Sequence, residues 1–435
     1  MSLIGWIPFL VLQPAPAEDW YRLEVTLVTD SDWTAVRFEN AGGFWVEDQK
    51  VRTAGPVQVR TGALSLNKPS MDRTGATLDA VVHVTLPAEG DLEVVVTRGS
   101  IGSTRVSIKD VGELVHDTPT GEGTNRRVFK VGAAKVRALG ARRFEPRRLA
   151  DKLVLAFYYP WYGTPEGPSK RWVHWDPQQH NAATNTPRLG LYDSHDEGLI
   201  RKHIEWARQA GVDGFISSWW GRGGFEDRAT RKLLAAAEKE KFLVTVYHEQ
   251  AKDARQLEED FAYLVREYGA SGAWLKAGGK PVIFVYTRVV GDFKPEDFSK
   301  ARGEAVLLMD TFDVGYGRAG GGLHAYNPVF TDLARLKKDY KSARYACAAQ
   351  GLVFAATVVP GYDDTVIRKP GGRRDREGGK FYDASWECAL SCDPDWILVC
   401  SWNEWHEGSE IEPSKEDGDR ALRQTAEWVR RWKGK

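Results

Sequence analysis

The chain has 435 residues, too many for one ordinary domain and enough for an accessory module of about 130 residues followed by an enzyme-sized unit of about 280. The 60 Lys and Arg residues balance the 60 Asp and Glu residues, so no global field points to a nucleic acid or an anionic membrane. A neutral or weakly charged partner is favoured. The 17 tryptophans, several in short runs, suit the flat C–H faces of sugar rings, although any single tryptophan could equally fill a core.

The N-terminal segment, residues 1–19, has an apolar run at 3–12 that is followed by Ala15-Pro16-Ala17, a step that suits signal peptidase. No Lys or Arg precedes the run, so two interpretations stay open. One is a secretion signal on an extracellular protein, and the other is a short buried or frayed segment on a cytoplasmic one. The run is too short for a membrane-spanning helix, and we expect no transmembrane segment.

Residues 20–145 show short alternating runs broken by Gly, Pro, Asp and Asn, at 23–27, 57–60, 81–86, 92–96 and 104–108. Period-two patterning at this spacing predicts an antiparallel β-sandwich-like accessory domain without a helix of normal length. Structural support, polysaccharide binding, shielding of the second domain and assembly all remain open as its role. The basic stretch at 142–148 is interpreted as a linker.

After residue 150 the pattern changes to apolar strands that alternate with amphipathic helices. Predicted strands span residues 153–159, 214–219, 243–248, 282–286, 306–310, 323–326, 353–359 and 397–402. Predicted helices span residues 196–209, 229–240, 254–268, 332–348, 383–390 and 418–432. Eight strands with mostly helical crossovers place residues 150–435 in the α/β class as a (β/α)8 TIM barrel.

The C-terminal ends of barrel strands surround the active site, and here most predicted ends are polar or aromatic. Strand one runs into YYPWYG, strand two into SWWG, strand three into YHE, strand seven into PGYDD and strand eight into NEWHEG. A purely structural barrel has little need for such ends. They supply candidate sugar-contacting rings, each of which could instead be barrel packing: Tyr159, Trp219, Trp220 and Tyr362.

Glu404 and Glu407 are the strongest candidates for catalysis. If residues 403–408 form one helical turn, the pair projects to one side with Cβ atoms about 5–6 Å apart. Cleavage of a glycosidic bond calls for two carboxyl groups, which lie about 5–5.5 Å apart in retaining enzymes. Burial near Trp402 and Trp405 would raise the pKa of the more buried carboxyl and make it the acid. His406 could orient one partner or point into packing.

Metal binding is the competing chemistry at this segment, because His406, Glu407, Glu410 and Glu412 could gather around a divalent ion. No H-E-x-x-H or comparable ligand spacing occurs, so we expect no metal. The cysteines have no C-x-x-C pairing, which favours structural thiols, with a disulfide possible in an exported protein: Cys347, Cys388, Cys392 and Cys400.

Five segments carry a resemblance to a known family: FYYPWYG (157–163), SSWWG (217–221), YHEQ (247–250), PGYDDTVIR (360–368) and SWNEWHEGSEIEP (401–413). From about residue 152 to its end the chain resembles family 99 glycoside hydrolases, whose characterised members are endo-acting α-mannosidases and α-mannanases. The last motif is the long and specific one. The resemblance implies a metal-independent retaining hydrolase, without a cofactor, that acts on α-mannosidic or related α-glycosidic linkages in oligosaccharides or polysaccharides.

The resemblance also implies roles. Glu404 would act as a base on the sugar's own 2-hydroxyl, giving a 1,2-anhydro-sugar, and Glu407 would be the general acid and then base. Glu249 matches a substrate-contacting glutamate, although Gln250 and Ala251 stand where the family has Pro-Tyr. Tyr326 matches a tyrosine near the reacting sugar. The N-terminal β-rich region lies outside the resemblance.

Two other functions stay open beside hydrolysis. A glycosyltransferase or transglycosidase of polysaccharide assembly would pass the same intermediate to a sugar acceptor. A non-catalytic carbohydrate-binding barrel would use the rings at the strand ends without cleavage. The glycine-rich basic loop at 369–380 is interpreted as a plain solvated loop, with a mobile lid or arginines that bind an acidic sugar as its functional alternatives.

Overall fold

The computed structural model describes residues 18–59, 62–69, 72–117, 125–144, 151–175 and 183–434. The apolar run at 3–12, the Ala15–Ala17 step and the last part of the predicted linker, from residue 145, lie outside these residues. Among the described helices, none combines the length and apolarity needed to cross a bilayer.

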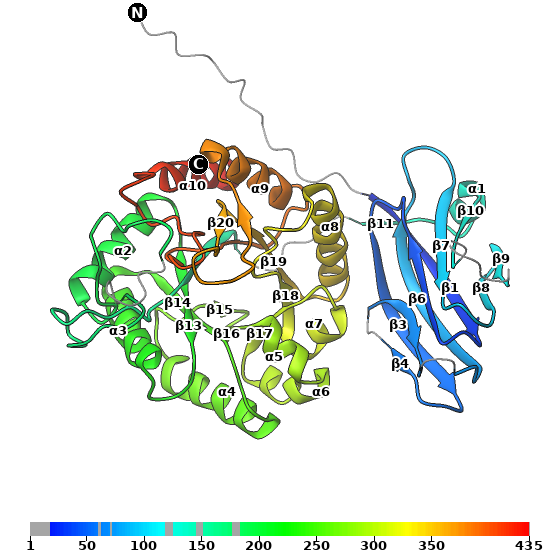
Figure 1. Cartoon of the computed structure of the whole chain (residues 1–435), viewed down its shortest axis with the longest axis horizontal. Coiled ribbons are helices and arrows are strands. Elements are labelled where there is room, and N and C mark those ends of the chain that lie inside the picture. The colour runs from blue at the N-terminus through cyan, green and yellow to red at the C-terminus, as the bar shows by residue number, and fades with distance from the viewer. Residues whose placement is uncertain are drawn as a thin grey trace, which may run out of the picture.

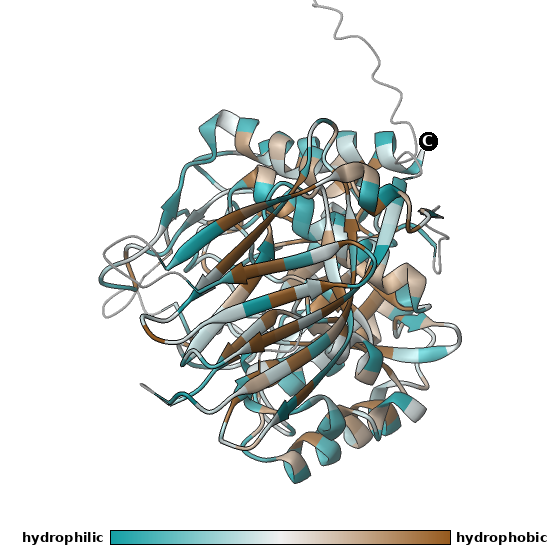
Figure 2. Ribbon diagram, turned by 90° about the vertical axis from the view of Figure 1, so that its right-hand side faces the viewer, coloured by the Kyte–Doolittle hydropathy of each residue, from teal (hydrophilic) through white to brown (hydrophobic). Residues whose placement is uncertain are grey.

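The N-terminal part is an antiparallel two-sheet sandwich, as predicted (Figure 1). Along its strands hydrophilic and hydrophobic residues alternate (Figure 2), and the hydrophobic ones fill the space between the sheets. One sheet has the order β3-β6-β1-β8-β9, with β11 paired to β1, and comprises β1 (Glu18–Thr29), β3 (Phe44–Thr53), β6 (Ala76–Thr85), β8 (Thr104–Ile108), β9 (Gly112–His116) and β11 (Arg142–Phe144). The other has the order β10-β7-β2-β5-β4 and comprises β2 (Trp33–Phe38), β4 (Gln58–Val59), β5 (Leu64–Asn67), β7 (Leu92–Arg98) and β10 (Arg126–Val131).

The C-terminal part is a closed parallel barrel, also as predicted. Its strands, in order around the barrel, are β12 (Leu153–Tyr158), β13 (Gly214–Trp219), β14 (Leu243–His248), β16 (Lys280–Val285), β17 (Val306–Asp310), β18 (Gly321–His324), β19 (Val353–Val358) and β22 (Trp396–Val399). Pairing of β14 with β16 and of β22 with β12 closes the ring. β13 is buried along its whole length because helices cover one face and the barrel interior the other.

Helices surround the barrel (Figure 1). They are α2 (Glu197–Gln209), α3 (Phe225–Glu240), α4 (Ala254–Tyr268), α5 (Thr287–Asp292), α6 (Pro295–Phe298), α7 (Val314–Gly320), α8 (Leu333–Ala349), α9 (Lys380–Leu390) and α10 (Arg420–Lys433). An aspartate begins α2, α4 and α8: the side chains of Asp196, Asp253 and Asp332 each accept a hydrogen bond from a backbone N–H of the first turn. The short helices α5 to α7 have too few residues to show a helical period in the sequence.

The sandwich packs against the barrel through α8. The Trp20 ring of β1 stacks on Tyr345 of α8, with ring centroids 4.0 Å apart, and Trp45 of β3 stacks on His83 beside them. Ser342 Oγ accepts a hydrogen bond from the Phe44 backbone N–H. These contacts hold the two parts side by side, as Figure 1 shows.

Two segments differ from their predicted character. The basic stretch at 142–148 was predicted as a linker, but its first residues form β11, because the N-terminal end of β1 offers an unpaired edge. The glycine-rich loop at 369–380 is not plainly solvated: Arg373–Arg374 forms β21, which pairs with β20 (Tyr362–Asp363). Arg376 Nη2 also donates to the backbone oxygens of Gly408 and Glu410.

All four cysteines are buried free thiols. Cys347 lies on α8, Cys388 on α9, and Cys400 directly after β22. Burial raises the pKa of the Cys388 thiol to about 11 and raises that of the other three as well. The thiol form therefore prevails at neutral pH.

Candidate active site

A cavity of about 450 Å³ opens at the C-terminal ends of the barrel strands. Glutamates, arginines and aromatic side chains share its wall, and they come from most of the strand ends. The lining residues are Tyr159, Trp161, His174, Trp220, Glu226, Tyr247, Glu249, Tyr286, Arg288, Tyr326, Arg368, Glu404 and Glu407.

Glu404 and Glu407 lie on a hydrogen-bonded turn, not on the predicted helical turn. The Glu407 N–H donates to the Glu404 carbonyl at 3.3 Å, but no helix follows, because Gly408 adopts a left-handed conformation with φ +57°. A Cβ at Gly408 would lie 3.2 Å from the Asp363 backbone nitrogen, so a larger residue would crowd this turn. The turn still brings both carboxyl groups to one cavity.

Two polar side chains fix this turn to the barrel. Ser401 Oγ accepts from the Glu404 N–H at 2.8 Å and contacts Ser409 Oγ at 3.0 Å, which ties the two ends of the turn together. Asn403 pairs with the Tyr159 backbone in both directions, accepting from its N–H at 2.7 Å and donating to its carbonyl at 3.1 Å. Glu404 is thereby held to the first and the last strands of the barrel.

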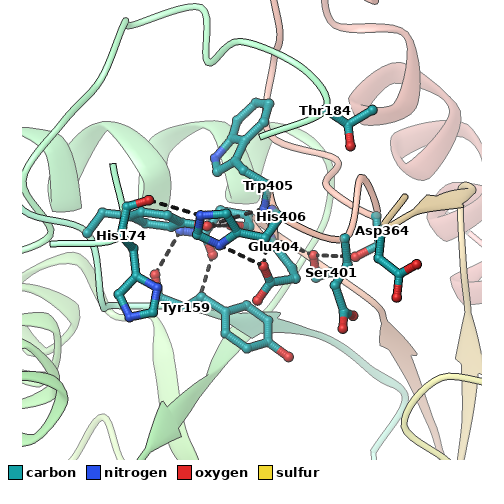
Figure 3. Close-up of polar contacts among 12 residues, drawn as sticks. Tyr159, His174, Thr184, Asp364, Ser401, Glu404, Trp405 and His406 are labelled. Carbon is teal, nitrogen blue, oxygen red and sulfur yellow. Dashed lines mark hydrogen bonds and ion pairs between the residues drawn. The ribbon is translucent and has the colours of Figure 1, made fainter. Parts of the chain in front are cut away.

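His406 contacts Glu404 instead of pointing away into packing. Its Nε2 lies 2.9 Å from the His174 carbonyl, and its Nδ1 lies 3.5 Å from Glu404 Oε1 (Figure 3). The His406 backbone N–H also donates to that oxygen at 3.2 Å. Burial raises the pKa of Glu404 to about 7, and the nearby Glu407 adds to this rise, whereas His406 opposes it.

Glu407 has a different partner. Arg368 Nη1 lies 3.0 Å from Glu407 Oε1, and the Glu407 carbonyl accepts from the Asp363 N–H at 2.7 Å. Burial raises the pKa of Glu407, and the Arg368 guanidinium opposes this rise. The two carboxyl groups of the pair thus face different basic side chains, His406 beside Glu404 and Arg368 beside Glu407.

A third carboxyl group, Glu249, lies in the same wall. Ser218 Oγ donates to its Oε1 at 2.7 Å, and Trp220 Nε1 donates to Ser218 Oγ at 2.9 Å. Burial, with the charge of Glu404 adding to it, raises the pKa of Glu249 to about 8. At neutral pH Glu249 is therefore mainly a neutral acid that can donate a hydrogen bond.

The structure brings most of the predicted site residues together, with three exceptions. Tyr159, Trp220, Glu249, Tyr326, Glu404 and Glu407 line the cavity, and the hydroxyls of Tyr159 and Tyr326 contact each other. Trp219 does not reach it, since its Nε1 donates to Asp227 at 2.8 Å and its ring stacks on His248. Tyr362 lies behind Arg368, and His406 lies behind Glu404.

Seven lining residues were not singled out in the sequence: Trp161, His174, Glu226, Tyr247, Tyr286, Arg288 and Arg368. Tyr247 and Tyr286 stand at the ends of correctly predicted strands, so strand ends alone could have identified them. His174 lies between β12 and α2, where the sequence has no periodicity. Its ring stacks on Trp161 with centroids 4.6 Å apart, and its φ of +58° turns the backbone carbonyl toward His406.

The competing metal ligands do not converge. Glu410 pairs with Arg376 at 2.7 Å, and Glu412 accepts from Tyr192 and lies 3.2 Å from His203, so both carboxylates have other partners than a shared ion. Within the described parts of the chain, no group of three His, Cys, Asp or Glu residues is arranged to hold a metal.

Comparison with known proteins points to one family. The sequence profile of Glycosyl hydrolase family 99 matches residues 149–304 and 324–423, more than half of the chain. The human "Glycoprotein endo-alpha-1,2-mannosidase-like protein" is 26% identical over 309 residues, which cover 59% of this chain and 67% of that protein. The rat "Glycoprotein endo-alpha-1,2-mannosidase" is 26% identical over 311 residues, which cover 60% of this chain and 67% of that protein.

A solved structure agrees with these sequences. The GH99 endo-alpha-mannosidase from Bacteroides thetaiotaomicron superposes with a TM-score of 0.59 at 28% identity, and the match covers 66% of this chain and 98% of the bacterial one. Both stretches matched by the family profile fall in the barrel or directly before it, so the family resemblance concerns the part of the chain that holds the cavity.

Proposed function

The chain belongs to glycosyl hydrolase family 99, and from this premise we propose that it cleaves α-mannosidic linkages in oligosaccharides or polysaccharides with retention of configuration. The family, the barrel and the names of the relatives make it an endo-α-mannosidase-like glycoside hydrolase. The observation that carries the proposal is the pair Glu404 and Glu407 in one cavity, each beside a different basic side chain.

In the proposed first step Glu404 is the base. It takes the proton of the sugar's 2-hydroxyl, whose oxygen attacks C1, while Glu407 gives its proton to the departing glycosidic oxygen. In an α-mannoside the 2-hydroxyl lies on the face opposite the leaving group, so this attack is in line. The product is a 1,2-anhydro-sugar.

In the second step the roles reverse. Glu407, now ionised, takes a proton from water, which attacks C1 and opens the three-membered ring, and O2 regains a proton from Glu404. Two inversions at C1 give net retention. A general base works best with a pKa near the working pH, and the pKa of Glu404, about 7, fits this role.

The first test replaces each carboxyl group. Glu404→Gln and Glu407→Gln should each lower kcat on an α-mannoside by at least about 10²-fold while sugar binding and folding persist. The exposed Glu377, which does not line the cavity, offers a control, and Glu377→Gln should keep wild-type rates. Rates close to wild type in either cavity variant would contradict the assignment, and we expect EDTA to leave activity unchanged.

The second test concerns the intermediate. A substrate with a 2-deoxy or 2-O-methyl reacting sugar lacks the attacking hydroxyl, so it should bind but resist cleavage. Normal cleavage of this substrate would mean that Glu404 attacks C1 directly. Products longer than the substrate would reveal transfer to a sugar acceptor in place of water.

A further inference from the structure

Arg368 stands between Glu407 and a buried pair of side chains. Its Nη1 lies 3.0 Å from Glu407 Oε1, 2.7 Å from the Tyr362 hydroxyl and in contact with Asp364 Oδ2. Asp364 is only 4% exposed, and it also accepts from the Tyr362 hydroxyl at 2.9 Å. One cation is thus held by Asp364 and Tyr362 and presented to Glu407.

The backbone fixes this arrangement. Asp364 and Gly372 are joined by reciprocal contacts: the Asp364 N–H donates to the Gly372 carbonyl at 3.1 Å, and the Gly372 N–H donates to Asp364 Oδ1 at 2.6 Å. The Arg368 N–H donates to the Asp364 carbonyl at 2.9 Å. The preceding residue, Asp363, is bonded to the Glu407 carbonyl, so the Arg368 loop and the Glu407 turn form one connected unit.

Charged and titratable groups from several elements influence Glu407. Among the described residues, Arg368 is the basic residue that forms a direct ion pair with the Glu407 side chain, at 3.0 Å. Glu404 shares the turn, while Glu249 and Arg288 lie in the cavity wall. The groups to consider around Glu407 are Arg368, Asp364, Tyr362, Glu404, His406, Glu249, Arg288, Tyr159, Tyr286, Tyr326 and Cys400.

We propose that Arg368 is a positioning residue for Glu407. Asp364 and Tyr362 hold Arg368 in place, and Arg368 in turn fixes the Glu407 carboxyl group in the cavity. Arg368 also sets the balance between the protonated and the ionised form of Glu407. The inference rests on the proposed function, in which Glu407 is first an acid and then a base. A guanidinium beside the carboxyl group stabilises the anion that remains after the leaving group is protonated. It keeps the same anion ready to take a proton from water in the second step.

The test compares Arg368→Met with Arg368→Lys on an α-mannoside. Loss of the cation raises the pKa of Glu407, so the limb of the pH profile of kcat/KM that Glu407 controls should move to higher pH by about one unit in Arg368→Met. The same variant should lose about 10-fold or more in kcat, and less on a substrate with a dinitrophenolate leaving group, which needs little protonation. Arg368→Lys keeps a positive charge and should keep the limb near its wild-type position.

Arg373→Met is the matched control, because Arg373 follows in the same basic segment but pairs with Asp363 and Asp375 instead of Glu407. It should leave both rate and pH profile unchanged. An unmoved limb in Arg368→Met, or equal shifts in the Lys and Met variants, would overturn the proposal. Equal circular dichroism spectra would show that the variants are folded.

A second measurement does not depend on turnover. The measurement uses ¹³C NMR of labelled glutamate in a Glu404→Gln background. The Glu407 carboxyl should titrate at higher pH in the protein with Arg368→Met than in the protein with Arg368 intact. The Glu407→Gln variant identifies the Glu407 signal, because that signal is missing from its spectrum. Absence of this shift would refute the coupling of Arg368 to Glu407. Failure of the wild-type protein to cleave any α-mannoside would instead refute the proposed function, while the NMR shift would still decide on Arg368.

Discussion

Glu404 and Glu407 are close neighbours in the chain, but different side chains contact them. The Glu404 side chain is 3% exposed and that of Glu407 is 15% exposed, so burial alone would make Glu404 the acid of the pair. The proposed mechanism requires the opposite roles, with Glu404 as the base and Glu407 as the acid. His406 favours the ionised form of Glu404 that a base needs, but it offsets burial only in part, because the pKa of Glu404 still lies at about 7.

Glu249 offers a test of protonation state at the scale of one residue. Because burial raises its pKa to about 8, Gln should imitate the neutral acid: it can accept from Ser218 and donate to a sugar oxygen. Below pH 8 we expect Glu249→Gln to keep most of the wild-type kcat/KM and Glu249→Ala to lose about 10-fold or more. Equal losses in the two variants would mean that the ionised carboxylate is required.

The same group links stability to pH. The folded-state pKa of Glu249 exceeds its unfolded value, so the native state binds more protons than the unfolded state between about pH 4.5 and pH 8. The free energy of unfolding should therefore fall as pH rises through this window. Relative to wild type, Glu249→Gln should be more stable by up to about 4 kcal/mol at pH 8 and similar at pH 4, as measured by urea unfolding.

The residues of the site were predictable where a motif follows a regular strand. Glu404, Glu407, Glu249 and Tyr159 follow strands that the sequence marks clearly, and they line the cavity. Trp219 does not line the cavity, because consecutive side chains of a strand point to opposite faces and the Trp219 ring faces the helices. His174 and Arg368 come from loops whose course depends on tertiary contacts, which no local pattern records.

Among the elements, the barrel strands were predicted to within a few residues and the sandwich strands less well. Barrel strands such as β13 and β14 are short apolar runs that stand out from polar helices. Sandwich strands such as β3, with the polar sequence FWVEDQKVRT, have mostly exposed or half-exposed residues and carry little signal. The strand pairing of β11 was hidden for a similar reason, because its Arg-rich sequence is typical of a loop.

The contact between β1 and α8 gives a prediction at the element scale. Tyr345 is 5% exposed and stacks on Trp20, so Tyr345→Ala should lower the free energy of unfolding by about 2–4 kcal/mol. Tyr345→Phe keeps the ring and should cost less than about 1 kcal/mol. Guanidinium unfolding measures both values, and similar stabilities for the two variants would show that the stacked rings contribute little.

At the scale of the whole molecule, removal of the sandwich tests whether the barrel alone is active and soluble. All cavity-lining residues lie between Tyr159 and Glu407, so a protein of residues 151–435 should keep kcat within about a few-fold if it folds. It would expose the α8 surface around Tyr345, and we expect it to aggregate more readily than the full chain.

A charged replacement separates these two effects. In the truncated protein Tyr345→Lys should restore solubility, as measured by light scattering, because it removes the exposed ring. A truncated protein that is soluble but inactive would show that the sandwich shapes the cavity from outside.

The four buried thiols make the protein convenient for site-specific labelling. A thiol with a raised pKa and no access to solvent reacts slowly with maleimides, so the native cysteines need not be removed. A single new cysteine at Val366, which is 53% exposed and lies two residues before Arg368, could carry a fluorophore. Its emission during sugar binding would report whether the loop beside Glu407 stays in place or moves while the cavity is occupied.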